Sequence, residues 1–438
     1  MTSASPSLRR PEARRAVAFF VQAAFARLQA EVADGDEVEY ALDARSGLRG
    51  PALYDYRPLF RRYVERRLPQ LVRLPDYDTA VAVLGADPAI TAAARDGAPD
   101  ATGDAEALRD AMLVPLLVGA AEGAGGFDFD DEVFERVWQR LLATVAEAQR
   151  AFTAFAPLVG ATAPDVAFDL GDGVALRRVE VEALADAWPE SQGLLPDRYG
   201  VAADRRLALE IDLALPRGRS AEPPDAARRI ARAVLALRLV HGGPVAAGPC
   251  LFERVDWSPR AVRALPASVT QDLAGDPVRL EPSRAPLVRA LVERVRDAEG
   301  SGGAVAVALA RWGAASAAHD PGERAVGILQ AIEPLLAPDG AGAWAVAMRA
   351  AALCGNGAGE RELVAGALLA VQRIVRPGAP PVDAERVARV VDDSARVVLV
   401  AALEHGVDVA SLADLLDGVL LGARPRPQVV GGVQRAAA

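Results

Sequence analysis

The spacing of apolar residues changes twice along this chain of 438 residues, and these changes constrain the fold more than any other feature. Before about residue 151 and after about residue 284, apolar residues recur every three or four positions, which is the period of an amphipathic helix. Between these points they alternate with polar residues, as they do in a half-buried strand. The sequence therefore predicts a mainly α, multidomain protein of the α+β class. We expect an N-terminal helical region (1–150), a central α+β region with antiparallel strands (151–283), a C-terminal helical bundle (284–425) and a disordered tail (426–438).

Charged residues form two clusters in the N-terminal region. The helix expected at Leu59–Leu74 carries five arginines, which form either a solvated face paired with nearby acids or a face that contacts phosphates. We favour the solvated face. Four acids within Asp128–Glu132 precede a helix expected at Glu132–Ala148, whose dipole favours negative charge at its first turn. Because no EF-hand glycine or distal glutamate follows, we interpret these acids as a helix cap rather than a metal site.

The central region shows the clearest strand pattern of the chain. In Leu207–Leu215, leucines and an isoleucine alternate with alanines and acids, which predicts a half-buried strand. Gly171-Asp172-Gly173 separates two shorter apolar runs and predicts a hairpin turn. Helical spacing returns over Asp225–Leu239.

Composition limits the classes of function. The formal charge of −10 argues against a protein whose whole surface binds nucleic acid or an anionic membrane, because such binding needs a basic face. Cys250 and Cys354 are too few for a disulfide framework or a thiolate zinc site, and they fit a reducing compartment. Glu122–Gly126 lacks the lysine of a phosphate-binding loop, and the apolar run Ala16–Phe25 is too short for a membrane span. We therefore expect a cytoplasmic protein with no membrane partner, metal or cofactor.

The C-terminal region contains one strong helix start and one long apolar stripe. Asp320-Pro321-Gly322-Glu323 combines an N-cap acid, a proline at the first helical position and a glutamate able to close a capping box. In Leu363–Gly378 four apolar residues follow one helix face: Val364, Leu368, Val371 and Val375. Short loops between such helices predict a bundle.

The run from Val371 to Gly378 resembles the late helix of the Apea-like branch of the HEPN superfamily, which ends in a motif like Arg-x-x-Ile-Val-His-Gly. Ile374-Val375 matches this motif, but Val371 stands in place of the catalytic Arg and Arg376 in place of the catalytic His. Further pieces agree in order over about Ala304–Gly422, among them Arg311-Trp312, Gln330–Leu335 and Met348–Leu353. The resemblance implies a HEPN-like helical bundle that dimerises, in a family that often cuts RNA and serves in antiphage or stress defence.

The two replacements remove the chemistry that the resemblance implies. Metal-independent RNA cleavage needs a group that moves protons near neutral pH, and neither valine nor arginine can do so. We therefore expect a catalytically degenerate protein that binds RNA or a partner protein through a dimeric cleft, with Arg373 and Arg376 as nucleic-acid-binding residues. By resemblance, Glu333 and Arg349 support the site, while Val371 fits a self-complementary dimer surface.

Two alternatives to this binding function stay open. The first is a metal-independent endoribonuclease with a rearranged site, to which His319 or His405 would contribute, although the catalytic residues cannot be named. The second is a structural helical scaffold.

Overall fold

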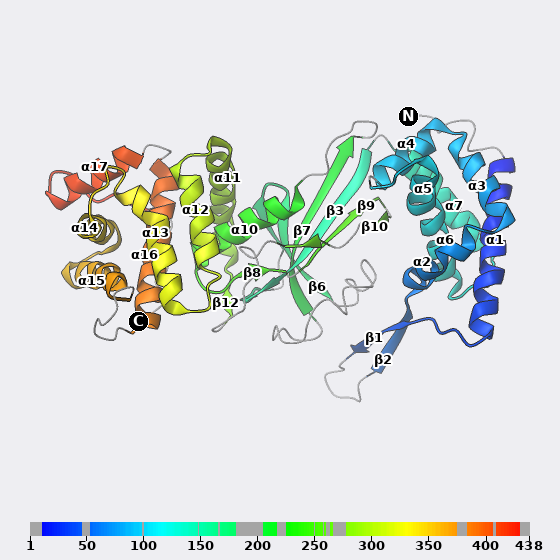
Figure 1. Cartoon of the computed structure of the whole chain (residues 1–438), viewed down its shortest axis with the longest axis horizontal. Coiled ribbons are helices and arrows are strands. Elements are labelled where there is room, and N and C mark those ends of the chain that lie inside the picture. Colours follow the sequence, from blue (N-terminus) through cyan, green and yellow to red (C-terminus); the bar gives the residue numbers. More distant parts are fainter. Residues whose placement is uncertain are drawn as a thin grey trace.

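The computed structural model describes residues 11–45, 53–98, 100–147, 149–164, 167–180, 205–216, 225–248, 250–256, 258–259, 263–265, 277–374, 383–405 and 409–429. Figure 1 shows three blocks along the longest axis: N-terminal helices at one end, a sheet in the middle and a helical bundle at the other end. The fold is mainly α, with an antiparallel sheet in the central region. This architecture confirms the predicted fold class.

The N-terminal block consists of helices and one hairpin. Its helices are α1 (Pro11–Ala33), α2 (Phe60–Leu71), α3 (Pro75–Gly85), α4 (Pro88–Gly97), α5 (Asp104–Leu108), α6 (Val114–Ala124) and α7 (Asp131–Ala146), with a π-helical turn at Arg109–Leu113. Strands β1 (Tyr40–Arg45) and β2 (Leu53–Pro58) pair antiparallel and project from the helices (Figure 1). The sequence interpretation placed only helices here and did not predict this hairpin.

An aromatic cluster fills the core of the N-terminal block. The ring of Phe127 lies 5.3 to 5.7 Å from those of Phe25, Phe60 and Tyr63, which come from α1 and α2. Trp138 on α7 is 2% exposed. Among the described residues α1 alone is long and apolar enough to cross a bilayer, and its buried side chains contribute to this core.

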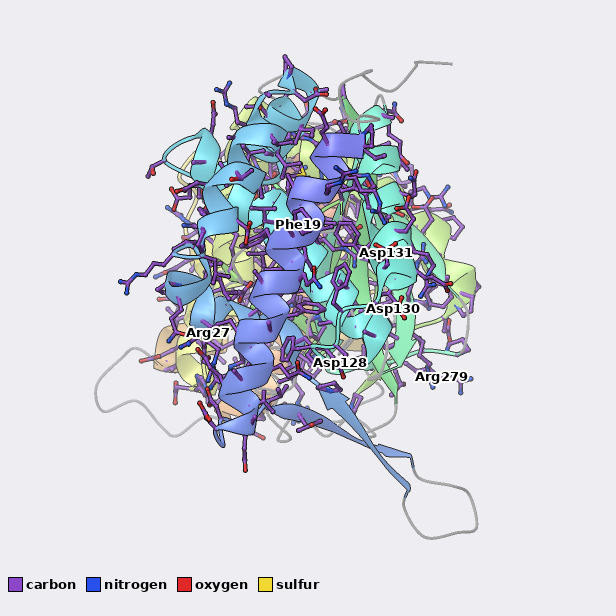
Figure 2. All side chains as sticks on the ribbon, turned by 90° about the vertical axis from the view of Figure 1, so that its right-hand side faces the viewer. Phe19, Arg27, Asp128, Asp130, Asp131 and Arg279 are labelled. Carbon is purple, nitrogen blue, oxygen red and sulfur yellow. The ribbon has the colours of Figure 1, made fainter. Side chains whose placement is uncertain are left out.

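Both charged clusters of the N-terminal block have structural partners. Arg61, Arg62, Arg66 and Arg67 of α2 form ion pairs with Glu31, Asp36, Glu39 and Glu65. The side chain of Asp130 caps α7 by accepting hydrogen bonds from the backbone N–H groups of Glu132 and Val133. Asp131 pairs with Arg14, and Figure 2 shows these acids beside α1. The pairing of these arginines with nearby acids and the helix cap are therefore confirmed, but only Arg62 and Arg66 are exposed, while the side chains of Arg61 and Arg67 are 12% exposed.

The central sheet has the strand order β10-β9-β3-β7-β6-β5, with β8 paired to β3 and β11 paired to β9. Its strands are β3 (Gln149–Val159), β5 (Phe168–Gly171), β6 (Val174–Glu180), β7 (Arg205–Pro216), β8 (Ala246–Ala247), β9 (Cys250–Val255), β10 (Ser258–Pro259) and β11 (Arg263–Ala264). The strands β4 (Ala161–Thr162) and β12 (Val278–Arg279) form a separate parallel pair. The predicted hairpin is β5–β6, and the predicted alternating strand is β7.

The remaining helices are α10 (Ala226–His241), which lies between β7 and β8 in the sequence, and those of the C-terminal bundle. A 3₁₀ turn, Pro282–Arg284, leads into α11 (Ala285–Ser301), α12 (Ala304–Ala315), α13 (Pro321–Leu336), α14 (Ala343–Cys354), α15 (Ala358–Ile374), α16 (Ala384–His405) and α17 (Val409–Leu420). The Asp320 carboxylate accepts the Glu323 N–H at 2.8 Å, so the predicted start of α13 is confirmed. In the predicted tail, Arg426 donates a hydrogen bond to Gly355 O, and residues 430–438 lie outside the described residues.

The sheet and the bundle share one hydrophobic core, which extends from Phe152 to Leu416, whereas α1–α7 have a core of their own. The boundary near residue 151 thus separates two cores, and the boundary near residue 284 lies within one. The independence of the three regions stays a prediction.

Buried charges reinforce the junction between α10 and α16. Arg396 is 2% exposed and donates hydrogen bonds to Leu239 O at 3.3 Å, to Val240 O at 3.4 Å and to Asp393 at 2.9 Å. Gly242, with φ +71°, ends α10 against this guanidinium, and a Cβ atom there would collide with it. Asp392 accepts the indole N–H of Trp312 at 2.8 Å, and burial raises the pKa of this aspartate. Arg396 therefore binds the last carbonyls of α10, where a cation is favoured by the helix dipole.

Candidate functional site

Only some of the residues expected to line a cleft around α15 fall within the described part of the chain. Val371 is 2% exposed within a single chain, so the expectation that it lies on a dimer surface is wrong. It packs in the core because it continues the apolar stripe of Val364 and Leu368, which is also buried. Arg373 is exposed at the last turn of α15 and forms no ion pair with a described residue. Arg376 lies outside the described residues.

Arg349 joins neighbouring helices and is not accessible to a ligand. It is 7% exposed and binds Asp417 of α17 through two hydrogen bonds, of 2.8 and 2.7 Å. A third hydrogen bond, of 2.6 Å, reaches Leu336 O at the end of α13. The guanidinium lowers the pKa of Asp417 below its usual value. Arg349 therefore ties three helices together, and it was named from the sequence without any sign of this role.

The ion pair between Arg349 and Asp417 predicts a pH-dependent stability. Because the folded-state pKa of Asp417 is depressed, the pair stabilises the protein above the usual aspartate pKa and loses its effect as the pH falls through the depressed pKa. We expect Asp417→Asn to cost about 1–2 kcal/mol at pH 7, since the carboxylate is partly exposed and screened. Chemical denaturation at pH 7 and near pH 2 measures this. Asp414→Asn on the same helix should change little, and an equal loss at both pH values would contradict the prediction.

Glu333 and Arg373 lie at opposite ends of α13. Ile374 packs against the first turn of α13, since a Cβ atom on Gly322 would lie 3.0 Å from Ile374 Cγ2. Glu333 is three turns further along, which is about 16 Å at the rise of an α-helix. The structure therefore does not bring Glu333 and Arg373 together, although the sequence analysis placed both in one cleft.

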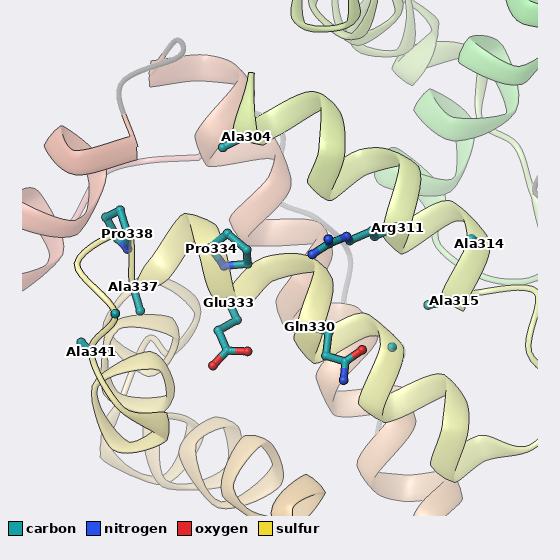
Figure 3. Close-up of a pocket in the computed structure, with 12 residues that line it drawn as sticks. Ala304, Arg311, Ala314, Ala315, Gln330, Glu333, Pro334, Ala337, Pro338 and Ala341 are labelled. Carbon is teal, nitrogen blue, oxygen red and sulfur yellow. The ribbon is translucent and has the colours of Figure 1, made fainter. Parts of the chain in front are cut away.

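Glu333 instead lines a groove of about 1010 Å³ between α12, α13 and the loop that follows α13. Figure 3 shows Arg311 extending from α12 towards α13, while Gln330 and Glu333 project from α13 on the side away from α12. The remaining lining residues are small or rigid: Ala304, Ala314, Ala315, Gly327, Pro334, Ala337, Pro338, Gly340 and Ala341. The groove is thus largely apolar, with one cation, one amide and one carboxylate.

Close packing of two helices forms the floor of the groove at one end. A Cβ atom on Gly327 would lie only 2.8 Å from Ala315 Cβ, so glycine is needed for α13 to approach α12. Val307 is 45% exposed and falls within the arc of α12 that lines the groove, between Ala304 and Arg311. Trp344 is 65% exposed in the first turn of α14, three residues after Ala341. Val307 therefore adds an exposed apolar side chain to the α12 side of the groove.

The polar residues of the groove do not form an acid–base pair or a metal site. Arg311, Gln330 and Glu333 make no ion pair or hydrogen bond with a described residue, and their side chains are exposed. The part of the chain that the structure describes contains no group of three His, Cys, Asp or Glu residues able to hold a metal. The groove offers separate charges to a ligand rather than a reacting pair.

The histidines are distributed over different parts of the fold. His241 is the last residue of α10, where burial and the nearby Arg284 lower its pKa to about 4, so it is neutral at pH 7. His319 precedes the cap of α13 and lies at the same end of this helix as Arg373. The ion pair between Arg324 and Glu385 places the start of α16 at this end too. His405 ends α16 and is thus about 30 Å away along that helix.

Comparison of the chain with protein-family models, with curated proteins and with solved structures found no significant match.

Sequence reasoning named only Glu333 among the polar residues of the groove. Arg311 and Gln330 occurred in the sequence pieces that carry the resemblance, but neither was given a role. A usable signal was present on α13, because Gln330 and Glu333 are exposed polar residues three positions apart, whereas α12 offers only Arg311 among its alanines. That signal could not show that residues of both helices line the same groove.

Proposed function

We propose that this chain is a non-catalytic binding protein that uses the α12–α13 groove to bind a protein partner. The observation that carries the proposal is the chemistry of the groove lining, in which apolar alanines and prolines surround three separated polar side chains. Such a surface favours another apolar surface with complementary charges.

The same lining supports a protein ligand over RNA. Nucleic-acid grooves present several cations along the phosphate backbone, together with aromatic side chains on which bases stack. This groove has one arginine, Arg311, one carboxylate, Glu333, and no aromatic residue among its lining. The formal charge of −10 also disfavours association with phosphates.

The proposal keeps the HEPN-like relationship and the homodimer as parts of one hypothesis. The relationship, and with it the homodimer, is supported by the ordered set of sequence pieces over about Ala304–Gly422, whereas the loss of both catalytic residue types at Val371 and Arg376 supports the non-catalytic part of the hypothesis. A reducing, cytoplasmic setting is supported by the two cysteines, Cys250 and Cys354, which are free thiols. Light scattering should give about twice 45.8 kDa if the homodimer forms.

Site-specific photo-cross-linking tests the binding function. A benzophenone amino acid in place of Val307, at the groove rim, should yield a discrete cross-linked protein product in the native cells. Ala314→Trp should abolish this product, because Ala314 lines the groove, is exposed and would carry an indole into the space. Ala310→Trp adds the same bulk to an exposed site of α12 outside the groove and is the matched control. Cross-links to RNA alone, or products insensitive to Ala314→Trp, would contradict the proposal.

One observation favours a second candidate function, metal-independent RNA cleavage. His319 and Arg373 are both exposed at the same end of α13, and an imidazole with a guanidinium can move a proton and bind a phosphate. Incubation of the full chain with RNA in a metal chelator separates the candidates. We expect no cleavage. Cleavage that disappears in His319→Ala would replace the binding proposal by the nuclease.

A further inference from the structure

We infer that the chain pairs with a second copy of itself through the outer edge of β2, so that two β1–β2 hairpins form one four-stranded antiparallel sheet. The hairpin projects from the N-terminal block, and among the described strands β1 and β2 pair only with each other (Figure 1). This contact is independent of the α12–α13 groove. It also differs from the homodimer expected from the resemblance, which uses the C-terminal bundle.

The backbone of β2 offers hydrogen-bonding groups at every second residue of its outer edge. The Leu59 N–H donates to Glu39 O at 2.7 Å, which extends the ladder by one hydrogen-bonded pair. Because hydrogen-bonded and non-hydrogen-bonded pairs alternate in an antiparallel ladder, odd-numbered residues of β2 bond to β1, and even-numbered residues direct their N–H and C=O groups outward. Tyr54 and Tyr56 therefore each present an N–H and a C=O group at this edge, and Pro58 presents a C=O group.

The charges of β2 select one register for the pairing of two such edges. Because only even-numbered residues face outward, the two longest two-fold pairings of β2 with a second β2 are centred on Asp55 and on Tyr56. Centring on Asp55 places this acid opposite its counterpart in the second copy, and like charges directly opposite each other are destabilising. Centring on Tyr56 places Asp55 opposite Arg57 of the second copy, and Arg57 opposite Asp55 of the second copy. This register has the self-complementarity that a two-fold interface requires.

The same register resolves a conflict of charges within the hairpin. In the β1–β2 ladder Asp43 is paired with Asp55, whereas Arg57 is paired with Ala41. Each acid therefore has another acid opposite it, which is unfavourable. In the four-stranded sheet each Asp55 gains an arginine on its other side. β1 has the same order of charges, but Asp43 and Arg45 lie at the end of that strand, so pairing through β1 would cover fewer residues.

The composition of one face of the hairpin also favours a larger sheet. Residues that are paired in the ladder lie on the same face, as do alternate residues of each strand. One face is apolar and aromatic, and consists of Tyr40, Leu42, Ala44, Tyr54, Tyr56 and Pro58. It holds three of the six tyrosines of the chain, a residue type enriched at interfaces. A lone two-stranded hairpin is marginally stable in water, whereas three or more strands with an apolar face can be stable. The second copy supplies the strands that the hairpin lacks.

Sedimentation equilibrium of the full chain tests the contact. The paired edges are short, so we expect a weak monomer–dimer equilibrium, measured over about 1–100 µM. Asp55→Arg and Arg57→Asp should each weaken the dimer about tenfold, because two attractive pairs become repulsive. An equimolar mixture of these two variants should recover the wild-type affinity, since every arginine then has an aspartate opposite it. Arg136→Asp changes an exposed charge on α7 by the same amount and is the matched control.

The outcomes separate this contact from the homodimer of the proposed function. A monomer throughout the concentration range would overturn both. A dimer that neither variant weakens would keep the homodimer and overturn the contact through β2. Variants that stay weak when mixed would also overturn the contact, because damage to the hairpin of each variant, rather than repulsion between copies, would then explain the loss.

Disulfide formation tests the register. Tyr56→Cys should give a cross-linked dimer on mild oxidation, because in this register the two residues at position 56 form a hydrogen-bonded pair with Cα atoms about 5.5 Å apart, within the range of a disulfide. Asp55→Cys has Arg57 of the second copy opposite it and should give much less of this product. The wild type, with free Cys250 and Cys354, provides the background. A cross-link that is stronger for Asp55→Cys than for Tyr56→Cys would overturn the register.

Discussion

Arg396→Ala is expected to destabilise the sheet and the bundle together by about 3–5 kcal/mol. The guanidinium is 2% exposed, donates to two carbonyl groups at the end of α10 and pairs with Asp393. Truncation leaves Leu239 O without this donor, and it removes one of the two arginines that donate to Val240 O and the nearest cation to Asp392. Hydrogen exchange followed by mass spectrometry should show faster exchange in α10, β7 and α16 alike, because their side chains share one core.

A matched control separates this effect from the loss of a charge on the surface. Arg389→Ala removes an exposed arginine from the same helix and should change the free energy of unfolding by no more than about 0.5 kcal/mol. Faster exchange confined to α16, with β7 unaffected, would contradict the description of the sheet and the bundle as one core.

Trp138→Ala should have an effect of similar size in the N-terminal block alone. Trp138 is 2% exposed in the aromatic core, and truncation of a buried tryptophan to alanine costs about 3–5 kcal/mol through lost contacts and a residual cavity. We expect faster exchange in α1–α7 and unchanged exchange in the sheet and the bundle. The exposed neighbour Arg136 on α7 provides the control as Arg136→Ala. Parallel loss of protection along the whole chain would show that the two cores unfold as one unit.

Local signals in the sequence were sufficient to predict most of the helices and strands. The alternation in Leu207–Leu215 gave β7, because a strand with one buried face needs that period. The acid, proline and glutamate at Asp320–Glu323 gave the start of α13, because capping is decided within one turn. The stripe through Val364 and Val371 gave the buried face of α15.

Features that depend on packing between distant segments could not be predicted from local sequence patterns. The hairpin of β1 and β2 was missed because short apolar runs among long helices do not distinguish strand from helix. Val371 was placed on a dimer surface, and only the packed neighbours of α15 show that it is internal. The groove combines Arg311 with Glu333 from two helices, and no local pattern relates these residues.

The separation into two cores has a consequence for synthesis of the chain on the ribosome. All the residues that build the first core precede residue 146, so α1–α7 can fold as soon as this segment leaves the exit tunnel. The second core joins Phe152 to Leu416, and it cannot close until almost the entire chain has emerged. At elongation rates of about 5–20 residues per second, this core then stays incomplete for roughly ten seconds to a minute after β3 and β7 have been made. Nascent β3 and β7 are therefore the segments for which chaperone protection matters most during translation.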